Sequence, residues 1–123
     1  MFDAQPMDNC LFQNQYPAMQ AAILSIGTEL TSGQILNRNA HWIAKKLTDL
    51  GLVCSAHVAV PDFFQTIQET LDFLEKKSDL IFITGGLGPT SDDFTREVVN
   101  TWANTELHFD QVSWEHLNEQ LIK

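Results

Sequence analysis

Ile81-Phe-Ile-Thr-Gly-Gly-Leu-Gly-Pro-Thr-Ser-Asp-Asp-Phe-Thr95 is the stretch that decides the fold. An apolar, β-branched run ends at Thr84, and Gly85, Gly86 and Gly88 follow it. The next five residues supply a proline and several side chains that commonly cap helices. This order predicts a buried strand, a glycine loop and the start of a helix.

The glycine loop is suited to an anion, because glycines let backbone N–H groups approach a ligand and a helix N-terminus adds a positive dipole end. Asp92 and Asp93 lie in the same loop, and their carboxylates repel a phosphate unless a divalent cation lies between. The loop matches neither the Walker A pattern nor the dinucleotide fingerprint. It predicts a phosphorylated ligand handled with a metal ion. In the alternative, Asp93 only completes a capping box with Thr90 and Asp92 faces solvent.

The composition is that of one globular domain of 123 residues with a formal net charge of −9. The negative charge argues against non-specific binding to nucleic acid or to an anionic membrane surface. The two cysteines, Cys10 and Cys54, show no metal-ligand spacing and suggest no disulfide framework, so we expect a cytoplasmic protein.

The first twenty residues are polar and rich in amides, and they lack the pattern of a signal peptide. We expect residues 1–20 to form an N-terminal extension that is mobile or loosely docked. Met19 directly precedes the first strand-like residues and is a candidate start position.

The remaining chain alternates between apolar runs and stretches whose apolar residues recur every three or four positions, as on one face of a helix. Three apolar runs predict strands at residues 21–26, 52–60 and 80–84. Spacings of three and four predict helices from Ile35 to Leu50, from Phe64 to Leu74 and from Phe94 to Ala103. Residues 107–109 are a possible short strand, and Ser113 is a candidate cap of a last helix. The order strand–helix–strand predicts parallel strands with right-handed crossovers.

Three loops follow these strands, at residues 27–33, 61–62 and 85–93. Ligands of parallel sheets bind at the carboxyl ends of the strands, so the three loops are expected to line one cleft. Glu29 is then a candidate metal ligand or hydrogen-bond acceptor. Asp62 becomes a stronger candidate for a site residue because its loop is expected to face the same cleft. Taken alone, both are ordinary loop acids.

Two motifs resemble the N-terminal domain of the CinA (competence/damage-inducible) proteins. They are Ala21-Ala-Ile-Leu-Ser-Ile-Gly-Thr-Glu-Leu-Thr-Ser-Gly-Gln-Ile-Leu-Asn-Arg-Asn-Ala40 and Thr84-Gly-Gly-Leu-Gly-Pro-Thr-Ser-Asp-Asp-Phe-Thr95. The CinA proteins belong to the molybdopterin-binding superfamily that includes MogA and MoaB. The resemblance implies a three-layer α/β/α domain around a mostly parallel sheet, over residues 21–123. The family domain normally continues some tens of residues further, which implies that a last helix and a segment closing the site are absent.

For CinA-type domains the resemblance implies a metal-dependent ADP-ribose pyrophosphatase that uses Mg²⁺ or a similar ion. By motif position, the catalytic residues are Asp93 and Asp62, and the metal ligands are Asp93, Asp92 and Glu29. The expected substrate-binding residues are Thr28, Glu29, Gly85, Gly86, Gly88 and Thr90.

Two other functions stay open. The MogA-like branch implies molybdopterin binding and adenylyl transfer, and a shortened domain is compatible with a non-catalytic protein that binds a nucleotide. The expected partners are a small phosphorylated nucleotide or pterin and further copies of the chain, in a dimer or trimer. Neither nucleic acid nor a membrane is an expected partner.

Overall fold

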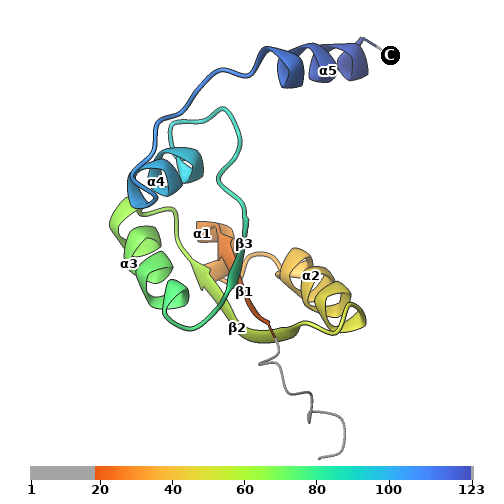
Figure 1. Ribbon diagram of the computed structural model, residues 1–123. Helices are drawn as coiled ribbons and strands as arrows, with labels where there is room; N and C mark the ends of the chain where they lie inside the picture. Colours follow the sequence, from red (N-terminus) through yellow and green to blue (C-terminus); the bar gives the residue numbers. More distant parts are fainter. Residues whose placement is uncertain (1–18, 123) are drawn as a thin grey trace, which may run out of the picture.

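The sheet is small and entirely parallel. The computed structural model describes residues 19–122. The expected mobile or loosely docked extension therefore lies outside the described residues over positions 1–18. Strands β1 (Gln20–Ile26), β2 (Val53–Val60) and β3 (Leu80–Thr84) pair in the order β2-β1-β3 (Figure 1). The predicted parallel pairing of the three strands is confirmed.

Helices cover both faces of this sheet. Helix α2 (Arg38–Asp49) lies on one face, whereas α3 (Phe64–Glu75) and α4 (Thr95–Trp102) lie on the other (Figure 1). The three-layer α/β/α architecture is therefore confirmed. Helix α4 is joined to α3 by a hydrogen bond of 3.0 Å from the Trp102 indole N–H to Asp72 Oδ1.

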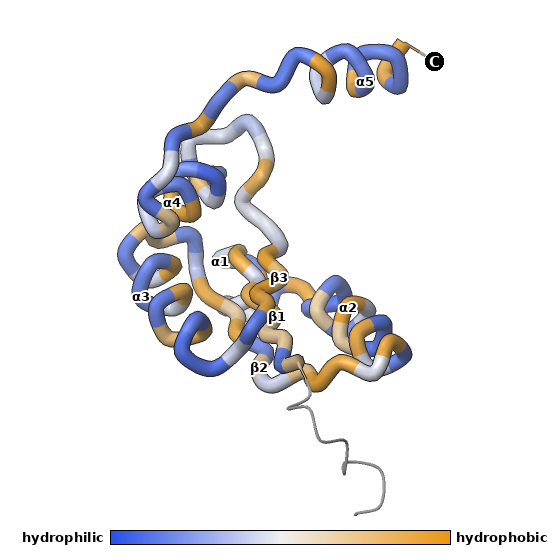
Figure 2. The backbone as a smooth tube through the Cα atoms, in the orientation of Figure 1, coloured by the Kyte–Doolittle hydropathy of each residue, from blue (hydrophilic) through white to orange (hydrophobic). Residues whose placement is uncertain are grey.

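The central strand β1 supplies both halves of the core. Ala22, Leu24 and Ile26 face the core shared with α3 and α4, whereas Ala21 and Ile23 pack with α2. Successive side chains of a strand point to opposite faces, so a strand covered on both sides is apolar throughout. Figure 2 shows this continuous apolar stretch along β1.

The start of α2 differs from the prediction. The helix begins at Arg38 rather than Ile35, and the Asn37 side chain accepts a hydrogen bond of 3.1 Å from the Ala40 N–H. This bond satisfies one of the free amides of the first helical turn and sets the boundary there. Ile35 and Leu36 precede the helix and are exposed.

Three other segments differ as well. The loop after β1 contains a short helix, α1 (Thr28–Thr31), that the sequence pattern did not predict. No strand forms at residues 107–109. In α5 (Gln111–Leu121), the N-cap is Asp110, whose carboxylate accepts from the Ser113 N–H, so the assignment of Ser113 as the cap was wrong.

Helix α5 stands away from the layered body (Figure 1) and buries none of its residues. Of the helices within residues 19–122, none combines the length and the hydropathy that a membrane-spanning segment needs.

The first prediction concerns the core between α3 and the sheet. Leu71 is fully buried, so Leu71→Ala removes packed methyl groups and leaves a cavity that costs about 2–5 kcal/mol of unfolding free energy. Phe73 on the same helix is half exposed, with Lys77 over its ring, so Phe73→Ala is expected to cost about 1 kcal/mol or less. Urea unfolding followed by circular dichroism measures both, and equal losses would contradict this assignment of the core.

Candidate functional site

The loops that follow the three strands meet in one cleft at the carboxyl edge of the sheet. The cleft has a volume of about 550 Å³ and includes residues from all three loops. It is lined by Ile26, Gly27, Thr28, Glu29, Asp62, Phe63, Gly85, Gly86, Thr90, Asp92 and Asp93. Glu29, Asp62 and Asp93 therefore converge on one cleft, as the strand order predicted. A roomier hollow of about 820 Å³ lies at the opposite edge, away from these loops, and is not our candidate.

Thr28 and Asp62 join the first two loops. Asp62 Oδ2 accepts hydrogen bonds from the Thr28 N–H at 2.8 Å and from the Thr28 hydroxyl at 3.1 Å. The Thr28 hydroxyl oxygen in turn accepts from the Asp62 N–H at 3.3 Å. A backbone bond of 2.9 Å from the Gly27 N–H to the Val60 carbonyl holds the same two loops together. The carboxylate of Asp62 is thus held by one of its two oxygens.

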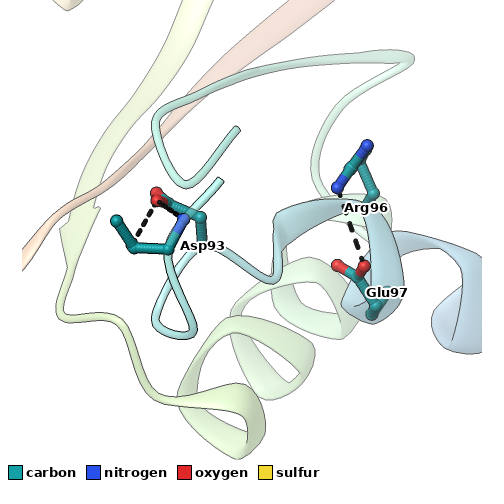
Figure 3. Close-up of polar contacts among 4 residues, drawn as sticks. Asp93, Arg96 and Glu97 are labelled. Carbon is teal, nitrogen blue, oxygen red and sulfur yellow. Dashed lines mark hydrogen bonds and ion pairs between the residues drawn. The ribbon is translucent and has the colours of Figure 1, made fainter. Parts of the chain in front are cut away.

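Thr90 and Asp93 repeat this arrangement within the third loop (Figure 3). Asp93 Oδ2 accepts from the Thr90 N–H at 3.1 Å and also from the Thr90 hydroxyl. The Thr90 hydroxyl bond and then the Thr90 amide hold the pKa of Asp93 below its usual value, against an opposing effect of burial. The two residues form a turn closed by the Asp93 N–H on the Thr90 carbonyl, but they do not start α4, which begins at Thr95.

Gly85 and Gly86 shape the loop after β3. Both have positive φ angles, of 92° and 63°, which disfavour residues with a Cβ. A Cβ on Gly85 would lie 1.9 Å from the Ile26 carbonyl oxygen, and one on Gly86 would lie 2.1 Å from Thr95 Oγ1. These glycines therefore let the loop cross the end of β1 at contact distance.

The carbonyls of this loop turn toward α4. The Thr95 N–H donates to the Gly86 carbonyl at 3.2 Å, and the Thr95 hydroxyl donates to the Gly85 carbonyl at 2.8 Å. Across a trans peptide the carbonyl and the next N–H point in opposite directions, so the amides of Gly86 and Leu87 point away from Thr95. Neither amide donates to another group in the described part of the chain. These two donors are available to an anion.

The residues that line the cleft carry four carboxylates, from Glu29, Asp62, Asp92 and Asp93, and no Lys, Arg or His. Arg96, at the start of α4, pairs at 3.9 Å with Glu97 rather than with Asp93 (Figure 3). The carboxylates of Asp62 and Asp93 are held by neutral hydrogen-bond donors, so these bonds do not compensate their charge.

The predicted metal ligands share the cleft but do not form a closed metal site. Within residues 19–122, no three His, Cys, Asp or Glu side chains lie close enough together to hold a metal ion. Asp93, Asp92 and Glu29 are thus not brought together as a three-ligand set. The donors fit a different mode, because Mg²⁺ is usually bound by one or two carboxylates plus phosphate oxygens of the substrate.

A second cleft of about 190 Å³ adjoins the first and shares Ile26, Glu29 and Gly85 with it. It adds Arg38 and Asn39 from the start of α2 and the apolar side chain of Ile35. The sequence pattern did not single out Arg38, which it placed in the first turn of a helix that starts at Ile35. The N-cap at Asn37 is the local signal that would have placed Arg38 at the edge of the sheet.

Residues 22–123 match the protein family described as "Probable molybdopterin binding domain". The chain belongs to this family. Among curated proteins, it is 37% identical over 105 residues to a putative competence-damage inducible protein of Lysinibacillus sphaericus, covering 85% of this chain and 25% of that protein. It is 39% identical over 101 residues to a CinA-like protein of Dictyoglomus turgidum, covering 82% of this chain and 25% of that protein. The resemblance to CinA is confirmed.

Solved structures of this family support the same relation. The fold is similar to a CinA protein of Thermoplasma acidophilum, with a TM-score of 0.77, 28% identity and coverage of 86% of this chain and 63% of that one. The fold alone is also shared with the molybdopterin biosynthesis enzyme MoaB of Thermus thermophilus, at a TM-score of 0.64, 24% identity and coverage of 68% and 54%. The chain spans about a quarter of the length of the curated relatives above.

The second prediction concerns the pH dependence of stability in this family member. Because the pKa of Asp93 is lower in the folded than in the unfolded chain, its stabilising contribution is complete above the ordinary value of about 3.9 and is lost as the pH falls through the folded value. Wild type is expected to unfold at higher urea than Asp93→Asn at pH 6, and the difference is expected to shrink below about pH 4.

Asp92→Asn serves as the control, since it removes the same charge one residue away at a side chain with no hydrogen bond in the described part of the chain. The difference in urea stability between wild type and Asp92→Asn is expected to depend less on pH. A pH-independent difference between wild type and Asp93→Asn would argue against the charged hydrogen bond to Thr90.

Proposed function

We propose that this domain hydrolyses the pyrophosphate bond of ADP-ribose or a related nucleoside diphosphate compound, with the help of a divalent cation. The observation that carries the proposal is the content of one cleft, where Gly85 and Gly86 of the glycine loop lie beside a group of uncompensated carboxylates. In the same loop, the amides of Gly86 and Leu87 donate no hydrogen bond within the described residues. A phosphate fits the amides, but it is repelled by the carboxylates unless a cation accompanies it. CinA family membership supports this function over other phosphate chemistry.

Each group of residues in and beside the cleft has its own proposed role in the reaction. The amides of Gly86 and Leu87 bind phosphate oxygens and stabilise the negative charge that develops during cleavage. Asp93 and Asp62 each offer the carboxylate oxygen that is not bound to threonine. A divalent cation bound there with the substrate phosphates would polarise phosphorus and lower the pKa of a bound water. Asp62 would orient the attacking water, which adds across the pyrophosphate bond of ADP-ribose to give AMP and ribose 5-phosphate.

The adjoining cleft supports an extended substrate. A dinucleotide-like molecule needs a second pocket beside its phosphates, and the two clefts share Glu29 and Gly85. The apolar side chain of Ile35 and the polar groups of Arg38 and Asn39 suit a ring system with hydrogen-bonding edges. The reaction is proposed to take place in the cytoplasm.

A second candidate is pterin binding with adenylyl transfer, which the description of the family favours. It would use the same glycine loop and the same carboxylates. The negative charge of the phosphate has to be offset in the same way in a nucleotide and in a pterin ligand. The two functions differ in their products. Adenylyl transfer releases pyrophosphate from ATP when molybdopterin is present, whereas hydrolysis needs only water and ADP-ribose.

The third prediction tests the proposed activity. Purified protein is incubated with ADP-ribose and Mg²⁺, Mn²⁺ or EDTA, and AMP is measured by chromatography. AMP is expected with the metal ions and not with EDTA. Asp93→Asn keeps the shape of the side chain but loses the charge, so turnover is expected to fall by about 100-fold or more. Its melting temperature is expected to fall only by the modest amount that the second prediction requires, since Asn loses the charge but still accepts the Thr90 N–H bond.

Asp110→Asn is the matched control. Asp110 also accepts a hydrogen bond from a backbone N–H, that of Ser113 three residues later, and its pKa is lowered by the Ser113 hydroxyl and amide. It is the N-cap of α5 and does not line the cleft. Its turnover is expected to equal that of the wild type. Near-wild-type turnover of Asp93→Asn would reject the catalytic assignment, and tight nucleotide binding without turnover would favour a non-catalytic binding protein.

We also propose that the domain forms a homo-oligomer, a dimer or trimer. Trp114, Leu117 and Leu121 form one stripe along α5, and each is about half exposed or more. An exposed stripe of large apolar side chains is typical of a surface that binds protein. The partner that we propose is a second copy of the chain, whose own stripe is identical and self-complementary across a two-fold axis.

The fourth prediction follows from this stripe. Light scattering at micromolar concentration is expected to give a multiple of the 13.9 kDa chain mass. Leu117→Asp is expected to lower the mass to that of one chain, because it introduces a charge into the apolar stripe. Asn118→Asp on the same helix adds the same charge beside the stripe and is expected to have less effect. A monomeric wild type would contradict the proposal.

A further inference from the structure

Gly88 and Thr90 contact Asp93 rather than an open part of the cleft. The Thr90 N–H and hydroxyl both donate to Asp93 Oδ2, and a Cβ built on Gly88 would lie 2.7 Å from the same oxygen. The second half of the glycine loop is therefore occupied by the chain's own carboxylate, whereas the free amides belong to Gly86 and Leu87 in the first half.

The same bonding pattern occurs a second time, between residues 34 positions apart. Asp62 Oδ2 accepts from both the N–H and the hydroxyl of Thr28. In each pair one aspartate oxygen receives two bonds, and the other oxygen accepts none from the described residues. The donors are neutral in both pairs, so each aspartate is oriented while its negative charge stays available.

We propose that Thr28, Thr90 and Gly88 are positioning residues, which hold Asp62 and Asp93 by one oxygen and leave the other oxygen for a divalent cation. This inference rests on the proposed function and changes the role that the sequence motifs suggested, because these residues then act on the substrate through the aspartates. Groups that orient a metal ligand typically contribute about 10–100-fold to metal affinity or activity.

The experiment compares Thr90→Val, which loses the hydroxyl at nearly constant volume, with Thr90→Ser, which keeps it. Thr101→Val is the control, because the Thr101 hydroxyl donates at 2.9 Å to the Glu97 carbonyl within α4, outside the cleft. Mn²⁺ binding is titrated by electron paramagnetic resonance in the presence of AMP, whose phosphate supplies the oxygens that the carboxylates alone lack. The kcat and KM for ADP-ribose are measured separately.

Thr90→Val is expected to weaken Mn²⁺ binding and to lower kcat by about 10–100-fold each, with a nearly unchanged KM. Thr90→Ser and Thr101→Val are expected to resemble the wild type. Gly88→Ala keeps both hydrogen-bond donors of Thr90 but crowds the Asp93 carboxylate, so it is expected to follow Thr90→Val. Thr28→Val tests the second pair in the same way.

The outcomes separate this inference from the proposed function. Threonine-dependent Mn²⁺ binding without hydrolysis of ADP-ribose would support the positioning role and reject the proposed activity. Hydrolysis with a Thr90→Val variant that equals the wild type in Mn²⁺ affinity and kcat would reject the positioning role. A variant that raises KM alone would also reject it, since that result indicates direct contact with the substrate. Wild-type protein that binds no Mn²⁺ would overturn the role for both aspartates.

Discussion

The contact between Gly85 and the end of β1 governs the geometry of the cleft. Residue 85 has a φ of 92°, and any Cβ there would collide with the carbonyl oxygen of Ile26. The loop after β3 therefore crosses directly over the end of the central strand. Thr95 holds this crossing from the other side, through its bonds to the carbonyls of Gly85 and Gly86. A larger residue at position 85 would move the loop, and with it Asp93 and the free amides.

The central position of β1 has a second consequence. Its neighbours β2 and β3 both run parallel to it, so all three strands end at the same edge of the sheet. The loop with Asp62 and the loop with Asp93 then lie on either side of the segment that carries Thr28 and Glu29. Parallel pairing thus brings four carboxylates into one cleft, although nothing in their local sequence requires them to meet.

The electrostatics of this cleft are unusual for a site that binds an anion. The chain carries a net charge of −9, and no Lys, Arg or His lines the cleft itself. The free donors of the glycine loop, in the part of the chain that the structure describes, are the backbone amides of Gly86 and Leu87, which lack the full charge of Lys or Arg. In the function that we propose, a cation bound together with the ligand would offset the repulsion, so carboxylates and a glycine loop could serve the same substrate.

The elements that the sequence predicted well are those with a simple and complete pattern. Strand β1 is apolar at nearly every position because it is covered on both faces, and α3 places Ile67, Leu71 and Leu74 on one buried face. Boundaries were less predictable. Leu36 fits a helical spacing with Ala40 and Ile43, yet the Asn37 cap starts the helix after it. Residues 107–109 alternate like a strand but have no neighbouring strand to pair with in the described structure.

The sequence by itself determined the α/β class, the strand order along the chain, the edge of the sheet at which Glu29, Asp62 and Asp93 meet, and the family. Only the tertiary structure decided which atoms are already bonded. Thr28 and Asp62 lie 34 residues apart, so their bonds depend on the register of β1 against β2. The Thr90–Asp93 bonds are local, but they depend on a loop that delays α4 until Thr95. Hydrogen bonds need angstrom-scale placement of both partners, and that placement arises only when the strands and helices pack together.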